Sequence, residues 1–331
     1  MSAQTTQIAV CIPVYNAMPH LPDTLASLLN QTVSDFKILI VDDGSTDDSL
    51  ACLKAFQESA QDPRITVLTQ ANRGLTGTLN RMLEILGSGW MIRQDQDDIA
   101  LPSRVEKLQQ AIQQFPNAGM IYSHAAHWQQ GSPRGLLLTT PSGSTGLRSF
   151  LKTGYLPSIC HPSIALRVEA ALKLGGYRLD HLHVEDYDLY WRMGLHFDAH
   201  MVPEVLLGYR MTANSISDQN SRKQATNMLY VQYLLLSELW GKSSLPYEQV
   251  KPLLEGMVDT RHISFRRHMR SALVRYGSHR YGAFGLEMTK ALFASPASFF
   301  SRFLRKNAEI ARVGISPENF RKNQAELWPN A

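Results

Sequence analysis

The chain has 331 residues, 44% of them hydrophobic and 19% charged, with a formal net charge of +4, which suits one large globular domain with an appendage or two modest domains. Its apolar runs fall short of the roughly 20 residues of a membrane-spanning helix, and its first residues lack the pattern of a secretory signal. The three cysteines, Cys11, Cys52 and Cys160, match no zinc or redox motif. We expect a cytoplasmic protein.

Strands and helices alternate in the prediction for the first 115 residues. Short apolar runs predict strands at Ile8–Val14, 36–41, 65–68 and Trp90–Arg93. Apolar side chains at helical spacing predict helices at 21–30, after an N-cap at Asp47, at 75–86 and from 102 to 115. This order predicts an α/β fold with a mixed, mainly parallel sheet and helices on both faces, which binds ligands at the carboxyl ends of its strands.

The rest of the chain changes character twice. Residues 131–146 are rich in Gly, Ser, Thr and Pro and predict a surface loop. Further elements are expected at 163–167 (strand), up to 175 (short helix), 185–193 (helix) and 199–211 (strand). From residue 222 the pattern is helical, at 222–240, 247–259, 262–276, 282–293 and 296–312. We therefore predict a catalytic domain over 1–217 and a helical, basic extension over 218–331.

Carboxylates crowd the end of the fourth predicted strand, in the run Asp95-Gln96-Asp97-Asp98. Three carboxylates in four residues repel one another, so they need a cation or must take up protons. Oxygen-rich sites suit Mg²⁺ or Mn²⁺, which often bridge substrate phosphates. The alternative is a solvated acidic loop before the helix that begins at Pro102.

Two further polar segments are candidates for chemistry. In the run from Asp42 to Asp47, Asp43 could accept the N3–H of a uracil or thymine ring, although a turn with an N-cap also explains the segment. In Glu185-Asp186-Tyr187-Asp188, a carboxylate could act as general base, although a helix start also favours negative charge. His161 could contact a phosphate or sugar, or form a structural hydrogen bond.

The order of these segments resembles inverting glycosyltransferase family 2, whose catalytic domain has the GT-A fold. The resemblance covers about residues 8–217. It rests on Ile12-Pro13-Val14-Tyr15-Asn16, Val41-Asp42-Asp43-Gly44-Ser45-Thr46-Asp47, Asn72-Arg73-Gly74-Leu75, Arg93-Gln94-Asp95-Gln96-Asp97-Asp98 with Pro102 and Arg104, His161-Pro162-Ser163, Gly175-Gly176-Tyr177-Arg178, Glu185-Asp186-Tyr187-Asp188-Leu189 and Tyr209-Arg210.

The resemblance implies a role for several of these positions. Residues of the nucleotide-sugar site would be Pro13, Tyr15, Asp43, Arg73 and Asp95, with Asp43 reading the base. Asp97 and Asp95 would hold Mn²⁺ or Mg²⁺, with Asp97 the direct ligand. Asp186 would be the catalytic base in a metal-dependent, inverting transfer from a nucleoside-diphosphate sugar, with UDP-hexose as the expected donor. The acceptor would be a hydroxyl of a glycan or lipid-linked glycan, as in cell-envelope polysaccharide or lipopolysaccharide synthesis.

One departure from the family pattern concerns processivity. Processive members carry transmembrane helices and a Gln-x-x-Arg-Trp motif, whereas here Gln219-Asn220-Ser221-Arg222 is followed by Lys223. The chain therefore resembles enzymes that add a single sugar. Two other interpretations remain: a non-catalytic nucleotide-sugar or carbohydrate-binding relic, and a sugar-nucleotide pyrophosphorylase. The latter is disfavoured because Pro13-Val14-Tyr15-Asn16 stands where a Gly-rich phosphate loop is expected.

The predicted extension is basic. Residues 216–331 contain 17 Lys and Arg against 9 Asp and Glu, and six arginines with no acid lie between Arg261 and Leu286. Apolar residues at helical spacing accompany them, namely Phe265, Met269, Ala272, Leu273 and Tyr276. Basic amphipathic helices lie on anionic membrane surfaces, so the sequence predicts peripheral binding at the inner face of the cell membrane. The alternative is packing of the apolar sides on one another or into a homo-oligomer; nucleic acid is not expected, because the catalytic half is acidic.

Overall fold

The computed structural model describes residues 7–129, 131–137, 139–140, 146–180, 183–211, 221–277, 279–304 and 312–329. The chain divides into two compact units. The first unit comprises residues 1–151, 157–180 and 188–210, and the second comprises 152–156, 181–187 and 211–331. The predicted boundary between 217 and 218 lies outside the described residues.

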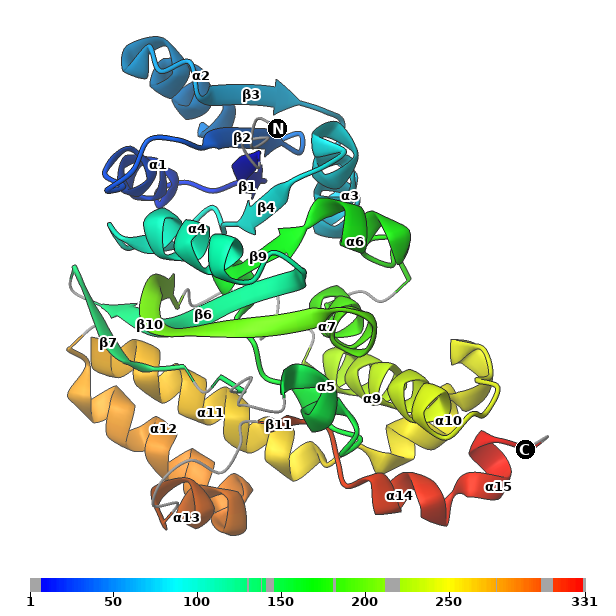
Figure 1. Cartoon of the computed structure of the whole chain (residues 1–331). Coiled ribbons are helices and arrows are strands. Elements are labelled where there is room, and N and C mark those ends of the chain that lie inside the picture. Colours follow the sequence, from blue (N-terminus) through cyan, green and yellow to red (C-terminus); the bar gives the residue numbers. More distant parts are fainter. Residues whose placement is uncertain are drawn as a thin grey trace. The chain divides into compact units, whose positions relative to one another are not determined.

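The first unit is built on a mixed sheet, as the sequence predicts. Its strands are β1 (Ile8–Val14), β2 (Lys37–Asp42), β3 (Ile65–Thr69), β4 (Trp90–Arg93), β5 (Ile99–Ala100), β6 (Ala118–Gln129), β7 (Ser132–Leu136), β9 (Ile164–Arg167) and β10 (Asp198–Arg210). The order is β3-β2-β1-β4-β9-β6-β10-β5, with β7 beside β6 (Figure 1). Strands β3, β2, β1 and β4 are parallel, whereas β9 is antiparallel to both of its neighbours.

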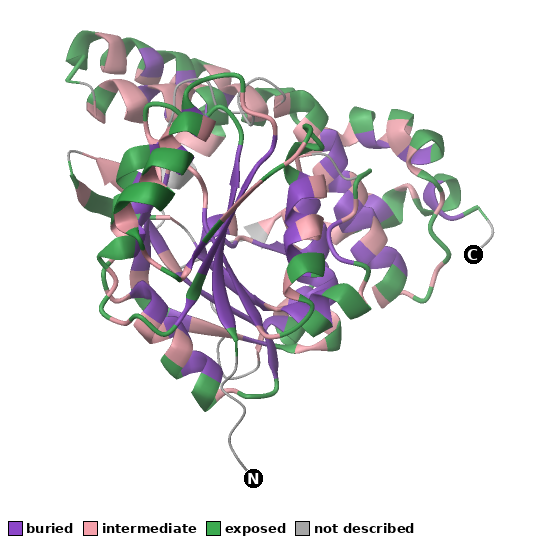
Figure 2. Ribbon diagram, turned by 90° about the horizontal axis from the view of Figure 1, so that it is seen from above, coloured by how far each residue is buried: buried purple, intermediate pink, exposed green. Residues whose placement is uncertain are grey.

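Helices cover both faces of this sheet. They are α1 (Leu21–Leu29), α2 (Ser49–Ala60), α3 (Gly74–Leu86), α4 (Arg104–Gln114), α5 (Gly146–Leu151) and α6 (Val168–Lys173), and α7 (Glu185–His196) begins in the second unit. Figure 1 shows α1, α2 and α4 on one face and α3 and α6 on the other. The strands between them are buried, as Figure 2 shows.

Strand β1 is buried on both faces because of its composition. All seven of its residues are buried, so the strand reads as one apolar run rather than an alternating one. Ile8, Val10 and Ile12 point to one face, where they share a core with Leu21, Leu25 and Leu28 of α1 and with Val105 and Leu108 of α4. The strand is thus fixed from both sides, and its carboxyl end holds a fixed position at the sheet edge.

Several elements differ from the sequence prediction. The long central strand β6 and the short β5 are not among the expected strands, although Pro116-Asn117 forms a turn directly before β6, in which the Ala118 N–H donates to Phe115 O at 3.0 Å. The loop predicted at 131–146 is wrong over Ser132–Leu136, which pairs with β6 as β7; residues 141–145 lie outside the described part. Helix α2 begins at Ser49 after Asp48, one residue later than expected, although Asp47 Oδ1 still accepts the Ser49 N–H at 3.0 Å.

The described part of the second unit is mainly helical, as predicted. Its helices are α9 (Ser221–Leu239), α10 (Tyr247–Met257), α11 (Thr260–Gly277), α12 (Tyr281–Ala294), α13 (Pro296–Leu304), α14 (Pro317–Lys322) and α15 (Gln324–Leu327). One core joins α9 and α10 to the last helices through Tyr233, Leu254, Phe320 and Trp328. Of the helix expected over 296–312, α13 covers Pro296–Leu304, residues 305–311 lie outside the described part, and Arg312–Val313 forms strand β11 instead.

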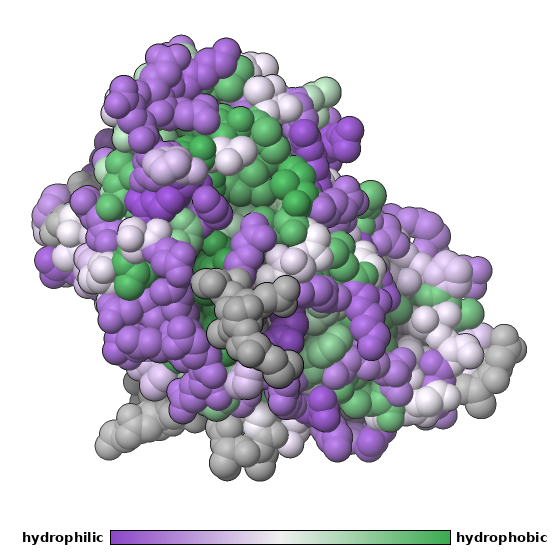
Figure 3. All heavy atoms as spheres, turned by 45° about the horizontal axis from the view of Figure 1, so that its top comes forward, coloured by the Kyte–Doolittle hydropathy of each residue, from purple (hydrophilic) through white to green (hydrophobic). Residues whose placement is uncertain are grey.

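The apolar side of α11 packs within the unit. Phe265 and Met269 form a cluster with Ala291 of α12, and Ala272 is fully buried. For these residues the packing alternative is therefore correct, and they do not form a free apolar face. None of the described helices is long and apolar enough to cross a membrane. On the face drawn in Figure 3, hydrophobic residues gather in an area bordered by hydrophilic ones.

Strand β4, which leads into the acidic run, depends on the glycine that precedes it. Gly89 has φ +88°, and a Cβ there would overlap the backbone carbonyl oxygen of Gln7, which accepts the Trp90 N–H at 2.8 Å. Gly87 also has a positive φ, +63°, but a Cβ there would meet nothing within 4 Å.

We therefore expect Gly89→Ala to destabilise the protein by about 1–3 kcal/mol more than Gly87→Ala does. Both substitutions place alanine in a left-handed conformation, which costs about 1–2 kcal/mol in each case. Urea denaturation followed by circular dichroism measures the difference. Equal losses in the two variants would show that the contact with Gln7 is unimportant.

Candidate active site

The acidic run and the Asp43 turn follow strands that are parallel in the sheet. Because β1, β2 and β4 run in the same direction side by side, their carboxyl ends meet at one edge. The Gln96 side chain ties two of these ends together: its Oε1 accepts the Tyr15 N–H at 2.7 Å, and its Nε2 donates to the Tyr15 carbonyl oxygen at 3.1 Å. Asp43 is linked to the same edge, since its N–H donates to Val14 O at 2.7 Å.

Asp43 is a buried carboxylate with one oxygen already engaged. Its Oδ1 accepts hydrogen bonds from Gln70 Nε2 at 2.6 Å and from the Arg73 N–H at 2.8 Å. Its Oδ2 accepts none from the part of the chain that the structure describes. The turn that carries it needs Gly44, which has φ +74° and lies against the Asn72 N–H and the Gln70 carbonyl oxygen. Asp43 is thus held at the sheet edge by the hydrogen bonds to its Oδ1, while its Oδ2 has no partner among the described residues and can accept a hydrogen bond from an external N–H donor.

The other residues expected at the nucleotide, Pro13, Tyr15 and Arg73, differ in how far their side chains are exposed. Pro13 is buried within β1, and Tyr15, directly after the strand, is 45% exposed. Arg73 precedes α3 with an exposed side chain, so only its backbone N–H contacts Asp43. The loop after Tyr15 is fixed by Asn16, whose Oδ1 accepts the Thr46 N–H at 2.8 Å. An exposed ring at Tyr15 beside a fixed loop can cover one side of a flat ligand.

The carboxylates of the acidic run repel one another. Asp95 pairs with the buried Arg93, and although burial opposes the Arg93 charge, the Asp95 carboxylate outweighs it and raises the pKa of Arg93. Burial, together with the charge of Asp95, raises the pKa of Asp97 to about 6. Asp98 is fully buried, and its pKa is raised well above the usual range by burial and by the charges of Asp95 and Asp97. The charges of Arg93 and Arg210 lower the pKa of Asp97, and the charge of Arg93 lowers that of Asp98, yet both pKa values stay above the usual range.

Two arginines hold the acidic run in shape, and neither has an assigned role in the sequence prediction. Arg104 is fully buried and donates to the carbonyl oxygens of Arg93 and Pro162, each at 2.6 Å, and to the Gln94 side chain. Arg210 donates its backbone N–H to Asp98 Oδ1 at 2.8 Å and its Nε to the Asp97 carbonyl oxygen at 2.9 Å. Both arginines belong to the family motifs, but the positions of these motifs in the sequence do not predict the contacts that the two side chains make.

The donor set fits a hard divalent cation. Burial and the charge of Asp95 raise the pKa of Asp97, and Asp98 Oδ2 is buried without a hydrogen-bond partner in the described structure. A dication would relieve this repulsion. Among the described residues, no group of three His, Cys, Asp or Glu side chains could by itself hold a metal.

The side chain of His161 forms a hydrogen bond within the protein, as the structural alternative predicts. Its Nε2 lies 3.0 Å from the hydroxyl of Tyr177, and Tyr177 exchanges two backbone hydrogen bonds with the side chain of Asn80. Burial, and then the charge of Arg93, lowers the pKa of His161 well below its usual value. The imidazole is therefore neutral at physiological pH and would give no charge to a phosphate.

The three carboxylates of the segment 185–188 have different surroundings. Asp188 is fully buried and accepts two hydrogen bonds from Arg192, at 2.9 and 2.5 Å, and one from Arg178 at 3.2 Å. Glu185 is buried, whereas Asp186 is half-buried and accepts the Tyr187 N–H at 2.8 Å. Asp188 is committed to a structural ion pair, and among the three Asp186 keeps the most solvent contact.

Comparison with known proteins gives one family. The model of glycosyl transferase family 2 matches residues 9–175. The chain is 28% identical over 183 residues to an uncharacterized glycosyltransferase of Haemophilus influenzae, a match that spans 55% of this chain and 60% of that protein. It is also 28% identical over 213 residues to the amylovoran biosynthesis glycosyltransferase AmsE of Erwinia amylovora, which spans 63% of this chain and 78% of AmsE.

Solved structures show the same fold at low sequence identity. S. aureus TarS 1–349 in complex with UDP-GlcNAc has a TM-score of 0.54 and 13% identity, with 88% of this chain and 92% of that chain covered. The mannosyltransferase PcManGT from Pyrobaculum calidifontis, in complex with GDP-Man and Mn²⁺, has a TM-score of 0.53 and 15% identity, with 98% and 88% covered. At these identities the likeness concerns the fold alone.

The raised pKa of Asp97 predicts how charge removal affects stability. A carboxyl group whose pKa is higher in the folded state destabilises the fold once the pH exceeds that pKa, and the penalty disappears below the unfolded value near 4. Asp97→Asn should therefore stabilise the metal-free protein at pH 7, by at most ~3 kcal/mol, and leave stability unchanged at pH 4. Urea denaturation in EDTA at the two pH values measures this. A loss of stability at pH 7 would contradict the crowding argument.

Proposed function

The chain belongs to glycosyl transferase family 2, and we propose that it is an inverting enzyme that transfers a single sugar from a nucleoside-diphosphate sugar, with UDP-hexose as the expected donor, to a hydroxyl of a glycan or lipid-linked glycan. The observation that carries the proposal is the crowding of Asp95, Asp97 and Asp98 at the end of β4, on the sheet edge that also carries Asp43. The relatives named for polysaccharide biosynthesis support the acceptor class.

The nucleoside half of the donor would bind where β1 and β2 end. Asp43 Oδ2, which accepts no hydrogen bond from described residues, would accept the N3–H of uracil, while Oδ1 stays fixed by Gln70. Tyr15 and Pro13 would contact the ring, and Arg73 would lie near the base or ribose. Uracil carries an N–H donor at this position, so a carboxylate favours it over a base with an acceptor there. The UDP-GlcNAc bound by TarS is consistent with this donor class.

Asp97, with Asp95, would hold Mn²⁺ or Mg²⁺ next to the diphosphate. Bound there, the ion would neutralise charge on the departing diphosphate. Asp95 would meet the ribose as well as the metal, while its ion pair with Arg93 keeps its carboxylate oriented. Arg210 would keep the Asp97–Asp98 peptide in place through its contacts with Asp97 O and Asp98 Oδ1. The Mn²⁺ in the PcManGT complex supports this choice of metal.

Asp186 would be the general base. The acceptor hydroxyl oxygen would form a bond to the anomeric carbon as the bond from that carbon to the diphosphate oxygen breaks. The hydroxyl proton would pass to Asp186, and the nucleoside diphosphate would leave with the electron pair of the broken bond. Attack from the face opposite the leaving group inverts the anomeric centre. Asp188 is unsuited to this role because Arg192 and Arg178 already occupy its oxygens.

The experiment that tests the proposal is the Mn²⁺-dependent hydrolysis or transfer of UDP-sugars, measured as UDP release from a panel of donors. A glycosyltransferase should release UDP, whereas a binding relic should not. A pyrophosphorylase should release no UDP, and should form sugar 1-phosphate and UTP once pyrophosphate is added. Absence of UDP release from every donor tested, by protein that binds UDP, would favour the relic.

Asp186→Asn should abolish transfer, by at least about 100-fold, because general-base catalysis typically contributes 10²–10⁴-fold. Its affinity for UDP in Mn²⁺ should stay within about twofold of that of the wild type. Glu185→Gln is the matched control and should retain most of the activity. Wild-type transfer by Asp186→Asn would refute the assignment of the base.

We also propose that the second unit binds the anionic, cytoplasmic face of the cell membrane, where a lipid-linked acceptor would lie. Its basic residues between Arg261 and Arg280 suit anionic lipid, and each one near the surface contributes about 1 kcal/mol. Phe265, Met269 and Ala272 of α11 are buried, although its Tyr276 is 52% exposed. The contact would therefore mainly use Leu286 and Phe293, which are seven residues apart on one face of α12 and are 57% and 79% exposed, with Phe300 at 53%.

Flotation with vesicles that contain anionic phospholipid tests this proposal. The protein should float at low salt and be released at high salt, and Leu286→Ser with Phe293→Ser should weaken flotation about tenfold. Ile85→Ser, which removes an apolar residue of α3 that is 45% exposed, should have no effect. If the protein stays unbound at both salt concentrations, the helices serve packing or a homo-oligomer instead.

A further inference from the structure

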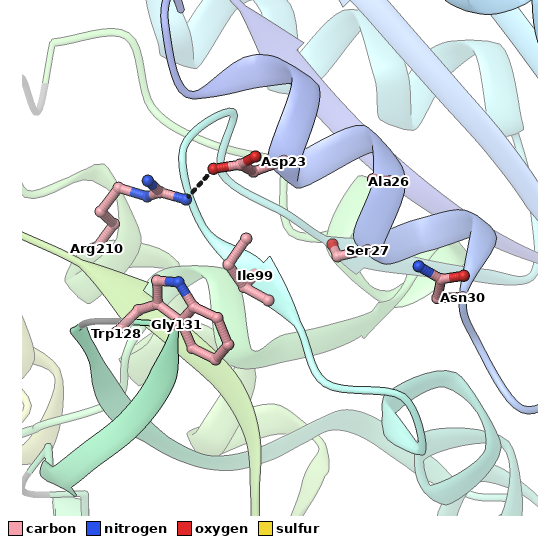
Figure 4. A pocket seen from close by; sticks show the side chains of 8 residues that line it. All are labelled: Asp23, Ala26, Ser27, Asn30, Ile99, Trp128, Gly131 and Arg210. Atoms are coloured by element: carbon pink, nitrogen blue, oxygen red, sulfur yellow. Dashed lines mark hydrogen bonds and ion pairs between the residues drawn. The ribbon is translucent and has the colours of Figure 1, made fainter.

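A polar pocket lies in the first unit beside the acidic run. It has a volume of about 530 Å³ and is open to solvent. Its walls come from α1, β5, the turn between β6 and β7, and the end of β10, as Figure 4 shows. The lining residues are Asp23, Ala26, Ser27, Asn30, Ile99, Trp128, Gly131 and Arg210. Apart from Arg210, which also holds the Asp97–Asp98 peptide, none of them has a role in the donor site proposed above.

Trp128 provides a fixed aromatic surface in this pocket. It lies near the end of β6 and rests on Gly208 of β10, where a Cβ would come within 2.5 Å of Trp128 Cε3 and 3.1 Å of Trp128 Cδ2. The indole is therefore held against a bare backbone on one side. It is half-buried, and its Nε1 has no hydrogen-bond partner among the described residues. The ring is ordered and yet retains an unused donor.

Arg210 lies beside Trp128, its register partner on β10, and each of its three guanidinium nitrogens contacts the protein. Its Nη2 lies 3.1 Å from Asp23 Oδ2, its Nη1 lies 3.0 Å from His20 Nδ1, and its Nε donates to the Asp97 carbonyl oxygen. The Arg210–Asp23 pair makes this wall nearly neutral, so the pocket offers little attraction for a phosphate or carboxylate. The same contacts attach the pocket directly to the loop that carries Asp97.

Unused polar groups face the aromatic surface from α1. The Asp23 side chain is 65% exposed, and its Oδ1 accepts no hydrogen bond from a described residue. Asn30, at the end of α1, is exposed, and its side-chain amide has no partner in the described structure. The pocket therefore combines a carboxylate acceptor, an amide that both donates and accepts, an indole N–H and an apolar wall at Ile99.

We propose that this pocket is a subsite for a neutral sugar residue of the acceptor glycan. A pyranose ring has an apolar C–H face and a rim of hydroxyl groups, so it suits an aromatic surface with a few convergent polar groups better than an ion or a purely apolar ligand does. This inference rests on the proposed glycosyl transfer. It adds that the enzyme recognises a glycan residue beyond the acceptor hydroxyl, through Trp128, Asn30 and Asp23.

The test uses the full chain and an array of defined neutral and anionic oligosaccharides of two to six residues. Wild-type protein should bind at least one neutral oligosaccharide, and Trp128→Ala and Asn30→Ala should each weaken that binding about tenfold. Trp128→Phe keeps an aromatic face and should stay within about threefold of the wild type. Leu136→Ala is the control, because Leu136 lies exposed on the neighbouring β7 and does not line the pocket.

Each variant is also titrated with UDP in Mn²⁺, which separates this inference from the proposed function. Unchanged UDP affinity with lost oligosaccharide binding supports the subsite. The subsite is contradicted if Trp128→Ala binds oligosaccharide as the wild type does, if only anionic oligosaccharides bind, or if none of the array binds. Failure of the wild type to bind UDP would instead count against the proposed donor site.

Discussion

The structure depends on the repulsion among three carboxylates at the end of β4. Asp98 is fully buried, Asp97 has a pKa of about 6, and Asp95 is compensated by Arg93. Burying a charge without a partner is costly, so such a group persists only where another charge arrives or the surroundings hold it in place. Arg104 and Arg210 hold the backbone of this segment, which prevents the carboxylates from moving apart. The three carboxylates thus stay close together, and a bound divalent cation would reduce the repulsion between them.

Because β1, β2 and β4 are parallel, Asp43 and Tyr15 of the proposed donor site lie at the same edge of the sheet as the acidic run. Asp43 has one oxygen fixed by Gln70 and the Arg73 N–H, and Tyr15 is joined to Gln96 by two hydrogen bonds. Under the proposed function, this one edge would hold the nucleotide at Asp43 and the cation at Asp97. The pocket beside Arg210 extends the same edge on its other side, since Arg210 contacts both Asp97 and Asp23.

Much of this could be predicted from the sequence, because short-range patterns decide it. Strand β1 and strand β4 have the predicted bounds, since an uninterrupted apolar run can only be buried on both faces. Strand β7 was missed because Gly131, Ser132 and Pro133 resemble a loop, and pairing with β6 overrides that preference. The contacts of Arg210 with Asp97 join residues more than a hundred positions apart, and no local pattern reports them. The buried side of α11 likewise depends on α12.

The most direct measurement is a calorimetric titration of the protein with UDP, in Mn²⁺ and again in EDTA. If the crowded carboxylates form the cation site of a donor complex, UDP should bind at least about tenfold more weakly in EDTA, a difference of about 1.4 kcal/mol. Asp97→Asn should lose this dependence while it remains folded. Equal UDP affinity with and without the cation would contradict the account.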